Sequence, residues 1–423
     1  MLSSCFFWII ICICILDFIY DIVMYKLNRK ASHLPIPKEL SGLYDEKAYA
    51  RQQDYSAQNA HLSIINSCVG SVILLLLFSF GVFGIFDSWA REITSYPIVV
   101  SLIFFGIIFL CSWLPEMPFG IYDTFVIEER FGFNRTTPKT YALDTLKSLL
   151  MTMIIGGGVI ALLSWIYSLM PDVFWIVAWS AMTIIMLFMQ FFYSDIIVPL
   201  FNKQTPLEEG ELRTAIESFA KKVDFKIKDI YVMDGSKRSS HANAYFTGFG
   251  SRKRIVLYDT LMEQLSTEEI VGVLAHEIGH YKHNHIVKGI VSALLTNLMM
   301  FYLFELVIDS KAIAEAAGSS VPSFHINLMV FSLIYTPVSE ILSIIDNIIS
   351  RRHEWQADEF ARVNGLGTPV ADALKKMSAK SLSNLTPHPA VVFVKHSHPT
   401  LLSRVRHLNK NNSHKFTQIG TNN

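Results

Sequence analysis

The chain has 423 residues, of which 51% are hydrophobic and 17% are charged, and its 36 basic side chains equal its 36 acidic ones. A typical soluble domain has about 25% charged residues, so roughly a third of the expected charge is missing. This composition excludes a disordered chain, a small disulfide-stapled secreted domain and a nucleic-acid binder with a basic face. The mean hydropathy of +0.36 indicates a membrane protein instead.

Seven apolar stretches are long enough, at about 20 residues, to cross the hydrocarbon core of a bilayer as helices. They are Cys5–Tyr25, Leu62–Phe86, Pro97–Leu114, Ser148–Leu169, Val173–Tyr193, Ile286–Ile308 and His325–Ser350. Only residues 170–172 separate the fourth from the fifth, a spacing typical of a tight helical hairpin. The sequence therefore predicts an all-α integral membrane protein with seven transmembrane helices.

Basic residues alternate between many and few from one connection to the next. Residues 26–61, 115–147, 194–288 and 351–423 hold 6, 4, 13 and 11 Lys and Arg, whereas residues 87–96 and 309–324 hold one each. Because Lys and Arg accumulate on the cytosolic side, we expect the N-terminus outside or in the lumen and the C-terminus in the cytosol. The first stretch lacks a basic start and contains Asp17 and Asp21, so it is interpreted as an anchor. The endoplasmic reticulum and the bacterial inner membrane are both open as locations.

Most of the polar material lies in the loop after the fifth span and in the tail after the seventh. The loop pattern predicts a helix near Thr205–Val223 and strands at Asp229–Met233, Ala244–Phe249 and Arg254–Tyr258. A further helix is predicted from Ser266 to about Asn284, because Ser266 and Glu269 have capping-box spacing before an apolar run. The tail 409–423 is polar and is expected to be frayed.

The last of these helices carries His276-Glu277-Ile278-Gly279-His280. Residues four apart lie on one face of a helix, so both imidazoles can point at one metal ion. Glu277 lies beside them, where its carboxylate can take a proton from an attacking water. By chance, the pattern is expected only about 0.02 times in such a sequence, so it indicates a zinc peptidase site.

A third protein ligand is needed, and the familiar long form of the motif does not supply it. That form would place glycine at position 283 and histidine at 286, where this chain has His283 and Ile286. One straight helix cannot wrap three consecutive turns around one ion, so His283 and His285 are interpreted as solvated residues or as neighbours of the ligands. Glu305 is about 37 Å from His280 if the helix is continuous, which is too far.

Glu354 is the better candidate for the third ligand. It lies just beyond the seventh span, on the same predicted side of the membrane as the motif. Asp358 follows one helical turn later on the same face and could accept the second N–H of a zinc-bound histidine. A charged strip on a surface helix would look similar, so spacing alone leaves that alternative open.

Several stretches of this sequence resemble the type I CAAX prenyl proteases, seven-span zinc metalloproteases of the a-factor-converting, gluzincin type. The resemblance covers nearly the whole chain. It rests on residues 125–134 (FVIEERFGFN), 199–203 (PLFNK), 239–246 (SSHANAYF), 276–280 (HEIGH), 354–358 (EWQAD) and 398–404 (HPTLLSR).

The resemblance implies a zinc ion held by His276, His280 and Glu354, one per chain, with Glu277 as general base. It also implies that Asn243 holds the substrate backbone and that His398 and Arg404 assist near the scissile carbonyl. In that family the membrane helices enclose a large water-filled chamber. Without the resemblance, Asn243 could equally be a turn residue and His398 a helix-start residue.

We therefore expect four parts: membrane helices 1–5 in residues 1–193, a metalloprotease loop in 194–285, helices 6 and 7 in 286–350, and a C-terminal part with the third ligand in 351–423. The polar parts would form a small α+β zinc-metalloprotease domain on the cytosolic side. The expected substrates are peptides or proteins cut near their C-termini, including prenylated ones. The lipid bilayer, but no nucleic acid, is expected as a further partner. Two alternatives are a membrane quality-control zinc protease without prenyl dependence and a non-hydrolytic chaperone or channel.

Overall fold

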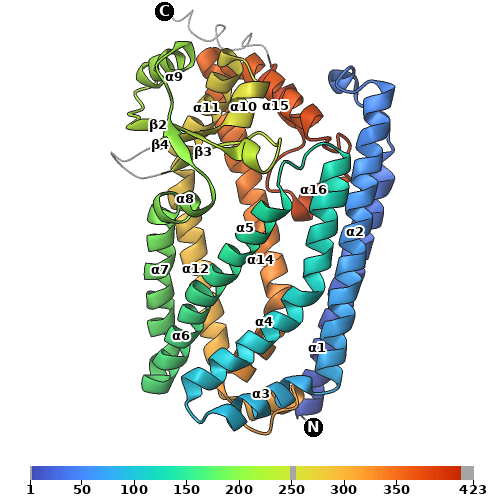
Figure 1. Cartoon of the computed structure of the whole chain (residues 1–423), viewed down its shortest axis with the longest axis vertical. Helices are drawn as coiled ribbons and strands as arrows, with labels where there is room; N and C mark the ends of the chain where they lie inside the picture. Colours follow the sequence, from blue (N-terminus) through green and yellow to red (C-terminus); the bar gives the residue numbers. More distant parts are fainter. Residues whose placement is uncertain (1, 248–253, 411–423) are drawn as a thin grey trace, which may run out of the picture.

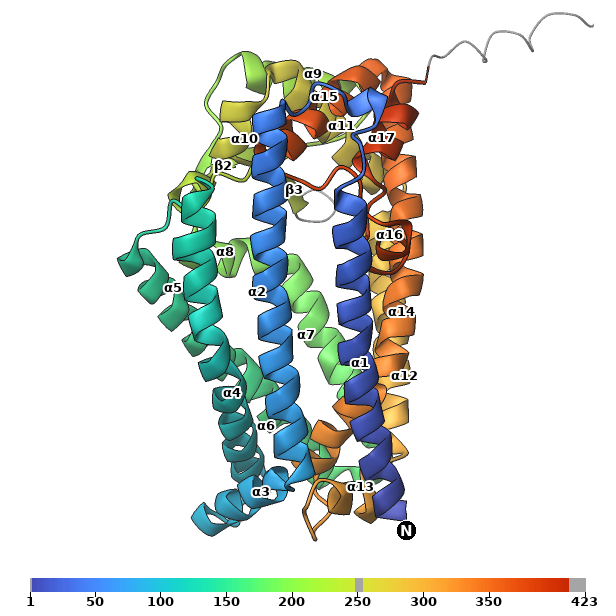
Figure 2. The same cartoon turned by 90° about the vertical axis from the view of Figure 1, so that its right-hand side faces the viewer.

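The computed structural model describes residues 2–247 and 254–410, and within them seven helical segments are long and apolar enough to cross a membrane. The seven predicted spans are therefore confirmed. The segments run along the long axis of the molecule (Figures 1 and 2). They are built from α1 (Leu2–Ser32), α2 (Glu46–Ser79), α4 (Pro97–Tyr122), α5 (Pro138–Met151), α6 (Gly157–Leu169), α7 (Phe174–Ile196), α8 (Val198–Phe201), α12 (His285–Glu305) and α14 (Phe324–Ala361).

Shorter elements connect or cap these helices. The helices are α3 (Val82–Ile93), α9 (Glu211–Lys222), α10 (Asp259–Gln264), α11 (Thr267–Lys282), α13 (Lys311–Ala316), α15 (Gly367–Lys380), α16 (Pro389–Lys395) and α17 (Leu401–Leu408). Single-turn 3-10 or π segments are η1 (Lys38–Leu40), η2 (Asp123–Glu128), η3 (Thr152–Gly156), η4 (Pro171–Val173), η5 (Gly235–Lys237) and η7 (Arg362–Leu366). The strands are β1 (Gln204–Pro206), β2 (Asp229–Met233), β3 (Ala244–Thr247) and β4 (Arg254–Tyr258).

The second span differs from its prediction, which continued the helix to Phe86. The structure ends α2 at Ser79 and turns the chain at Gly81, whose φ of 62° lies in the left-handed region that glycine adopts without strain. The chain then enters α3, which lies across the end of the bundle (Figure 2). Hydropathy alone could not detect this turn, because the apolar run continues through it.

The two ends of the bundle differ in composition. The N-terminus, α3 and α13 lie at one end, whereas the sheet, α9, α11 and α15 lie at the other (Figures 1 and 2). The connections that carry a single basic residue each are therefore together at the α3 end. We refer to the opposite end, which holds the sheet, as the sheet end.

The sheet has the order β1-β2-β4-β3, with β2 parallel to β4 and the outer strands antiparallel to their neighbours. Strand β3 is therefore an edge strand among the described residues. The start of the predicted helix at Thr205–Val223 was wrong, because β1 occupies Gln204–Pro206 and α9 begins only at Glu211. Pro206 favours an extended conformation at Thr205, which suits a strand. The last two residues of the predicted strand Ala244–Phe249, and most of the predicted tail, lie outside the described residues.

One hydrophobic core holds the sheet end together. It joins Ile255 and Leu257 of β4 to Leu274 of α11, and extends to Val370 of α15 and Val405 of α17, all almost fully buried. Residues from the loop after the fifth span and from the C-terminal part thus share a single core. That shared core fixes α11 against the C-terminal helices.

The α3 end is closed by buried polar contacts instead. Asp87 of α3 accepts hydrogen bonds from His325 Nε2, at 2.8 Å, and from Ser319 Oγ, at 3.0 Å. The other ring nitrogen of His325 lies 3.1 Å from Ser101 Oγ of α4. All four side chains are at most 5% exposed, so this cluster joins helices and cannot meet a substrate.

Candidate metal centre

Helix α11 begins where the capping box predicts. Ser266 Oγ accepts a hydrogen bond from the Glu269 backbone N–H at 3.4 Å, and Glu269 Oε2 accepts one from the Ser266 N–H at 2.8 Å. The helix continues to Lys282 and carries His276 and His280 on one face. Their Nε2 atoms are 3.1 Å apart, so both imidazoles converge on one point.

Helix α14 crosses α11 closely at this point because position 279 has no side chain. A Cβ atom built on Gly279 would lie 2.9 Å from Ala357 Cα and 3.0 Å from Phe360 Cβ. Contacts below 3.0 Å essentially never occur for real Cβ atoms, so a larger residue would force the helices apart. The glycine inside the His276–His280 motif thus allows α14 to bring Glu354 and Asp358 to the histidines.

Replacing Gly279 by Ala should therefore weaken metal binding and lower stability together. Overpacking of this kind typically costs about 1–3 kcal/mol. The measurements are the unfolding temperature and the zinc content of the purified protein. Gly289→Ala is the matched control, because a Cβ at Gly289 meets no atom within 4 Å. Equal unfolding temperatures and equal zinc contents in the two variants would show that the close crossing of α11 and α14 affects neither stability nor metal binding.

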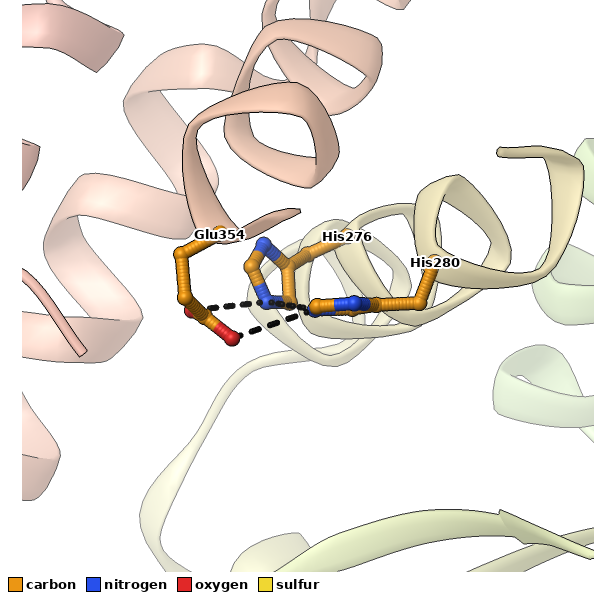
Figure 3. A group of neighbouring side chains, drawn as sticks. All are labelled: His276, His280 and Glu354. Carbon is orange, nitrogen blue, oxygen red and sulfur yellow. Dashed lines mark hydrogen bonds and ion pairs between the residues drawn. The ribbon is translucent and has the colours of Figure 1, made fainter. Parts of the chain in front are cut away.

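Glu354 completes a three-residue cluster with the two histidines (Figure 3). Its Oε2 lies 3.4 Å from His276 Nε2, and its Oε1 lies 3.2 Å from His280 Nε2. Glu354 is 4% exposed and His276 is 7% exposed, while His280 is half-buried. The three side chains come from two helices and point toward one another.

These distances fit a zinc ion. Neighbouring ligand atoms in a tetrahedral site with bonds of 2.0–2.2 Å are about 3.3–3.6 Å apart, and the three observed separations of 3.1, 3.2 and 3.4 Å are close to that range. Within the described residues, Glu354 Oε2 is buried without a hydrogen-bond partner and has only longer ion-pair contacts with Arg404 and His276, at 3.3 and 3.4 Å, so a bound cation would satisfy it. Two imidazoles and one carboxylate are also the donor set of many catalytic zinc sites.

Asp358 and Arg404 contact side chains of the cluster and hold them in place. Asp358 Oδ1 lies 2.8 Å from His276 Nδ1, and Arg404 donates to both Asp358 oxygens at 2.7 and 2.9 Å. Arg404 Nη1 is also 3.3 Å from Glu354 Oε2. Burial lowers the pKa of His276, but its contacts with Asp358 and Glu354 outweigh that effect and raise the pKa to about 9. The buried Arg404 thus contacts two carboxylates, both of which also contact His276.

Glu277 and His398 are neighbours of the cluster, Glu277 along the chain and His398 in space. Glu277 is half-buried beside His276, and no hydrogen bond or ion pair joins its carboxylate to any other described residue. The His398 side chain is 61% exposed, and its Nε2 lies 3.3 Å from Glu354 Oε1. Both side chains can therefore meet a bound peptide.

Asn243 is not brought into contact with the cluster. It precedes edge strand β3, and its Oδ1 accepts a hydrogen bond from the next backbone N–H, of Ala244, at 2.8 Å. Among the described residues, no hydrogen bond joins it to the two histidines or to Glu354. Asn243 instead borders a cavity of about 940 Å³, lined by Met186 and Met189 of α7 and by Tyr245 of β3.

The sequence did not single out Gln356, which is linked to His280 of the cluster through His285. His285 is buried, with its Nδ1 3.0 Å from His280 Nδ1 and its Nε2 2.8 Å from Gln356 Oε1, whereas His283 is exposed. The signal that could have revealed this arrangement is Asn284. Its φ of 56° ends α11 and returns the chain toward the site, and Asn tolerates that conformation better than most residues.

Comparison with known protein families agrees with this fold and cluster, and the chain belongs to peptidase family M48. Residues 24–203 match the family description "CAAX prenyl protease N-terminal, five membrane helices", and residues 206–412 match "Peptidase family M48". The chain is accordingly a multi-pass membrane protease that acts on peptides or proteins.

Individual relatives are similar over almost the entire chain. CAAX prenyl protease 1 homolog of rice is 34% identical, covering 96% of this chain and 98% of the relative, and CAAX prenyl protease 1 of Saccharomyces cerevisiae is 35% identical, covering 90% of each. The crystal structure of S. mikatae Ste24p superposes with a TM-score of 0.90 at 32% identity, covering 96% of this chain and 99% of that one. The resemblance read from the sequence motifs is thereby confirmed. Neither the quality-control protease nor the chaperone or channel is favoured by these similarities.

Proposed function

We propose that this chain is a zinc metalloendopeptidase that cuts peptide bonds near the C-termini of prenylated proteins. The observation that carries the proposal is the convergence of His276, His280 and Glu354 at zinc-like separations of 3.1–3.4 Å. Glu277, next to His276 in the sequence, is half-buried, and no described residue pairs with its carboxylate. Family M48 membership supports a peptidase, and the donor set supports zinc.

In the proposed mechanism, the three metal ligands, Glu277 and His398 each have a separate role. A zinc ion held by His276, His280 and Glu354 would polarise the scissile carbonyl and acidify the attacking water. Glu277 takes a proton from that water and passes it to the leaving amine. The exposed His398 donates a hydrogen bond to the oxygen on which negative charge develops.

The remaining residues position substrate and ligands. Asp358 accepts the Nδ1–H of His276, which leaves the Nε2 lone pair directed into the cluster. Arg404 holds Asp358 with two hydrogen bonds and balances the charge of Glu354, and its part in stabilising the transition state is indirect. Asn243 and edge strand β3 would bind the backbone of an extended substrate by strand addition.

The substrate proposal rests on the names of the relatives and on the cavity beside Asn243. The rice, human and yeast relatives are all called CAAX prenyl proteases. Methionine side chains in the cavity wall can adapt to a flexible apolar chain. An apolar group attached near the cleavage point would find such a surface next to β3.

The test compares a farnesylated C-terminal peptide with the same peptide unmodified, using the purified full chain. We expect zinc-dependent cleavage of the farnesylated peptide with at least about tenfold higher kcat/KM, the equivalent of 1.4 kcal/mol of transition-state stabilisation. Equal cleavage of both peptides would favour a quality-control protease. If the protein with zinc bound cleaves neither peptide, the peptidase assignment for these substrates is wrong.

We also propose that the sheet end, which holds the site, faces the cytosol. The membrane is either that of the endoplasmic reticulum or the bacterial inner membrane. The support is the distribution of basic residues, because 34 of the 36 lie in segments assigned to that side. Glu208→Cys at the sheet end and Glu315→Cys at the α3 end introduce exposed thiols. In sealed vesicles with the cytosolic face outward, a membrane-impermeant maleimide should label the first variant but not the second. The reverse pattern would invert the topology.

A further inference from the structure

His285 occupies a buried position directly behind a proposed zinc ligand. It is the first residue of α12 and is 6% exposed. Its ring stacks on His353 of α14, with centroids 3.9 Å apart and an interplanar angle of 14°. Stacking fixes the ring plane, so both ring nitrogens have defined neighbours.

The two nitrogens of His285 connect His280 to Gln356. His285 Nδ1 lies 3.0 Å from His280 Nδ1, and His285 Nε2 lies 2.8 Å from Gln356 Oε1. A neutral imidazole has one N–H and one lone pair. If Gln356 Oε1 accepts the Nε2–H of His285, then His285 Nδ1 has a lone pair and must accept the Nδ1–H of His280.

This order of donors and acceptors determines which ring nitrogen of His280 carries the proton. With its proton on Nδ1, His280 has the lone pair on Nε2, the atom that faces His276 and Glu354. The opposite order would place a proton on His280 Nε2, where it would prevent metal binding. The amide oxygen of Gln356 therefore selects, through His285, the tautomer of His280 that can bind a metal.

We propose that Gln356 and His285 are positioning residues that hold His280 in its metal-binding tautomer; this inference rests on the proposed zinc function. His276 is held by the carboxylate of Asp358, whereas His280 is held by a neutral imidazole and an amide. The two zinc histidines are thus supported by groups of different charge. Loss of such supporting partners typically weakens metal affinity about 10–100-fold.

The test measures zinc affinity of the purified full chain by competition with a chelator. Gln356→Met removes the acceptor at similar side-chain length, and His285→Phe keeps a ring to stack on His353 but cannot accept. Both should bind zinc about 10–100-fold more weakly. Gln356→Glu retains an acceptor and should keep the original affinity. The matched control is His283→Phe, because His283 is exposed and only stacks on His285 at 5.5 Å.

A second measurement separates positioning from general destabilisation. The metal-free Gln356→Met variant should unfold at the temperature of the metal-free original chain, but zinc should raise that temperature less than it does in the original. Zinc affinity of Gln356→Met equal to that of His283→Phe would overturn the inference. If the unaltered chain bound no zinc, the proposed function would fail as well, so the two failures are distinguishable.

Discussion

Replacing Glu277 by Gln should abolish peptide cleavage while the protein still binds zinc. The amide has the size of the carboxylate but cannot take a proton from the attacking water. Glu277 is not among the three clustered side chains, and no described residue forms a hydrogen bond or ion pair with its carboxylate. Its replacement should therefore leave the fold and the zinc ligands unchanged. Loss of a general base typically lowers kcat about 10²–10⁴-fold.

The measurement is kcat on the farnesylated peptide together with zinc content by elemental analysis. Glu268→Gln is the matched control, because Glu268 is an exposed carboxylate on the first turn of the same helix. It should retain full activity and full zinc content. Unchanged cleavage by Glu277→Gln would remove Glu277 from the mechanism, and loss of zinc in that variant would mean that it acts as a ligand.

The parts of the fold that could be predicted are those with strong local signals. Apolar length identified seven spans, and the capping box of Ser266 and Glu269 placed the start of α11 correctly. The failures came where the signal is conformational. Gly81 turns the chain within a continuous apolar run, and Pro206 ends a strand where a helix was expected.

The same division applies to the site. The spacing of His276 and His280 requires only helical geometry, so their convergence could be foreseen. The place of Glu354 depends on where α14 crosses α11, which Gly279 determines through contacts 78 residues away along the chain. Gln356 itself offered no signal in the sequence, because an amide on a helix acquires a role only through the ring that it contacts.

The local electrostatics explain why the proposed third ligand is a carboxylate. Two histidine ligands would leave the charge of a bound zinc ion unbalanced, and Arg404 adds a positive charge 3.3 Å from Glu354 Oε2. Asp358 and Glu354 together offset these charges in a buried environment. A buried charge without a partner is costly, so the acids and the guanidinium are expected to depend on one another.

Replacing Glu354 by Ala should therefore remove zinc from the protein. The substitution deletes the carboxylate whose oxygens lie 3.4 Å from His276 Nε2 and 3.2 Å from His280 Nε2. It also leaves Arg404, which lies 3.3 Å from His276 Nδ1, without the negative charge of Glu354. Because loss of a supporting residue alone costs about 10–100-fold in affinity, loss of a direct ligand should cost more than about 100-fold.

Elemental analysis of the purified variant checks this expectation, with Glu359→Ala as the control on the same helix. Glu359 pairs with Arg362 at 2.7 Å and with His407 at 3.2 Å, and it is not part of the three-residue cluster. Asp358→Asn should give an intermediate loss, because an amide oxygen can still accept the Nδ1–H of His276 but carries no charge. Full zinc occupancy in Glu354→Ala would refute its role as a ligand. The third donor would then have to come from elsewhere, and the exposed His398, whose Nε2 lies 3.3 Å from Glu354 Oε1, would be a candidate to replace it.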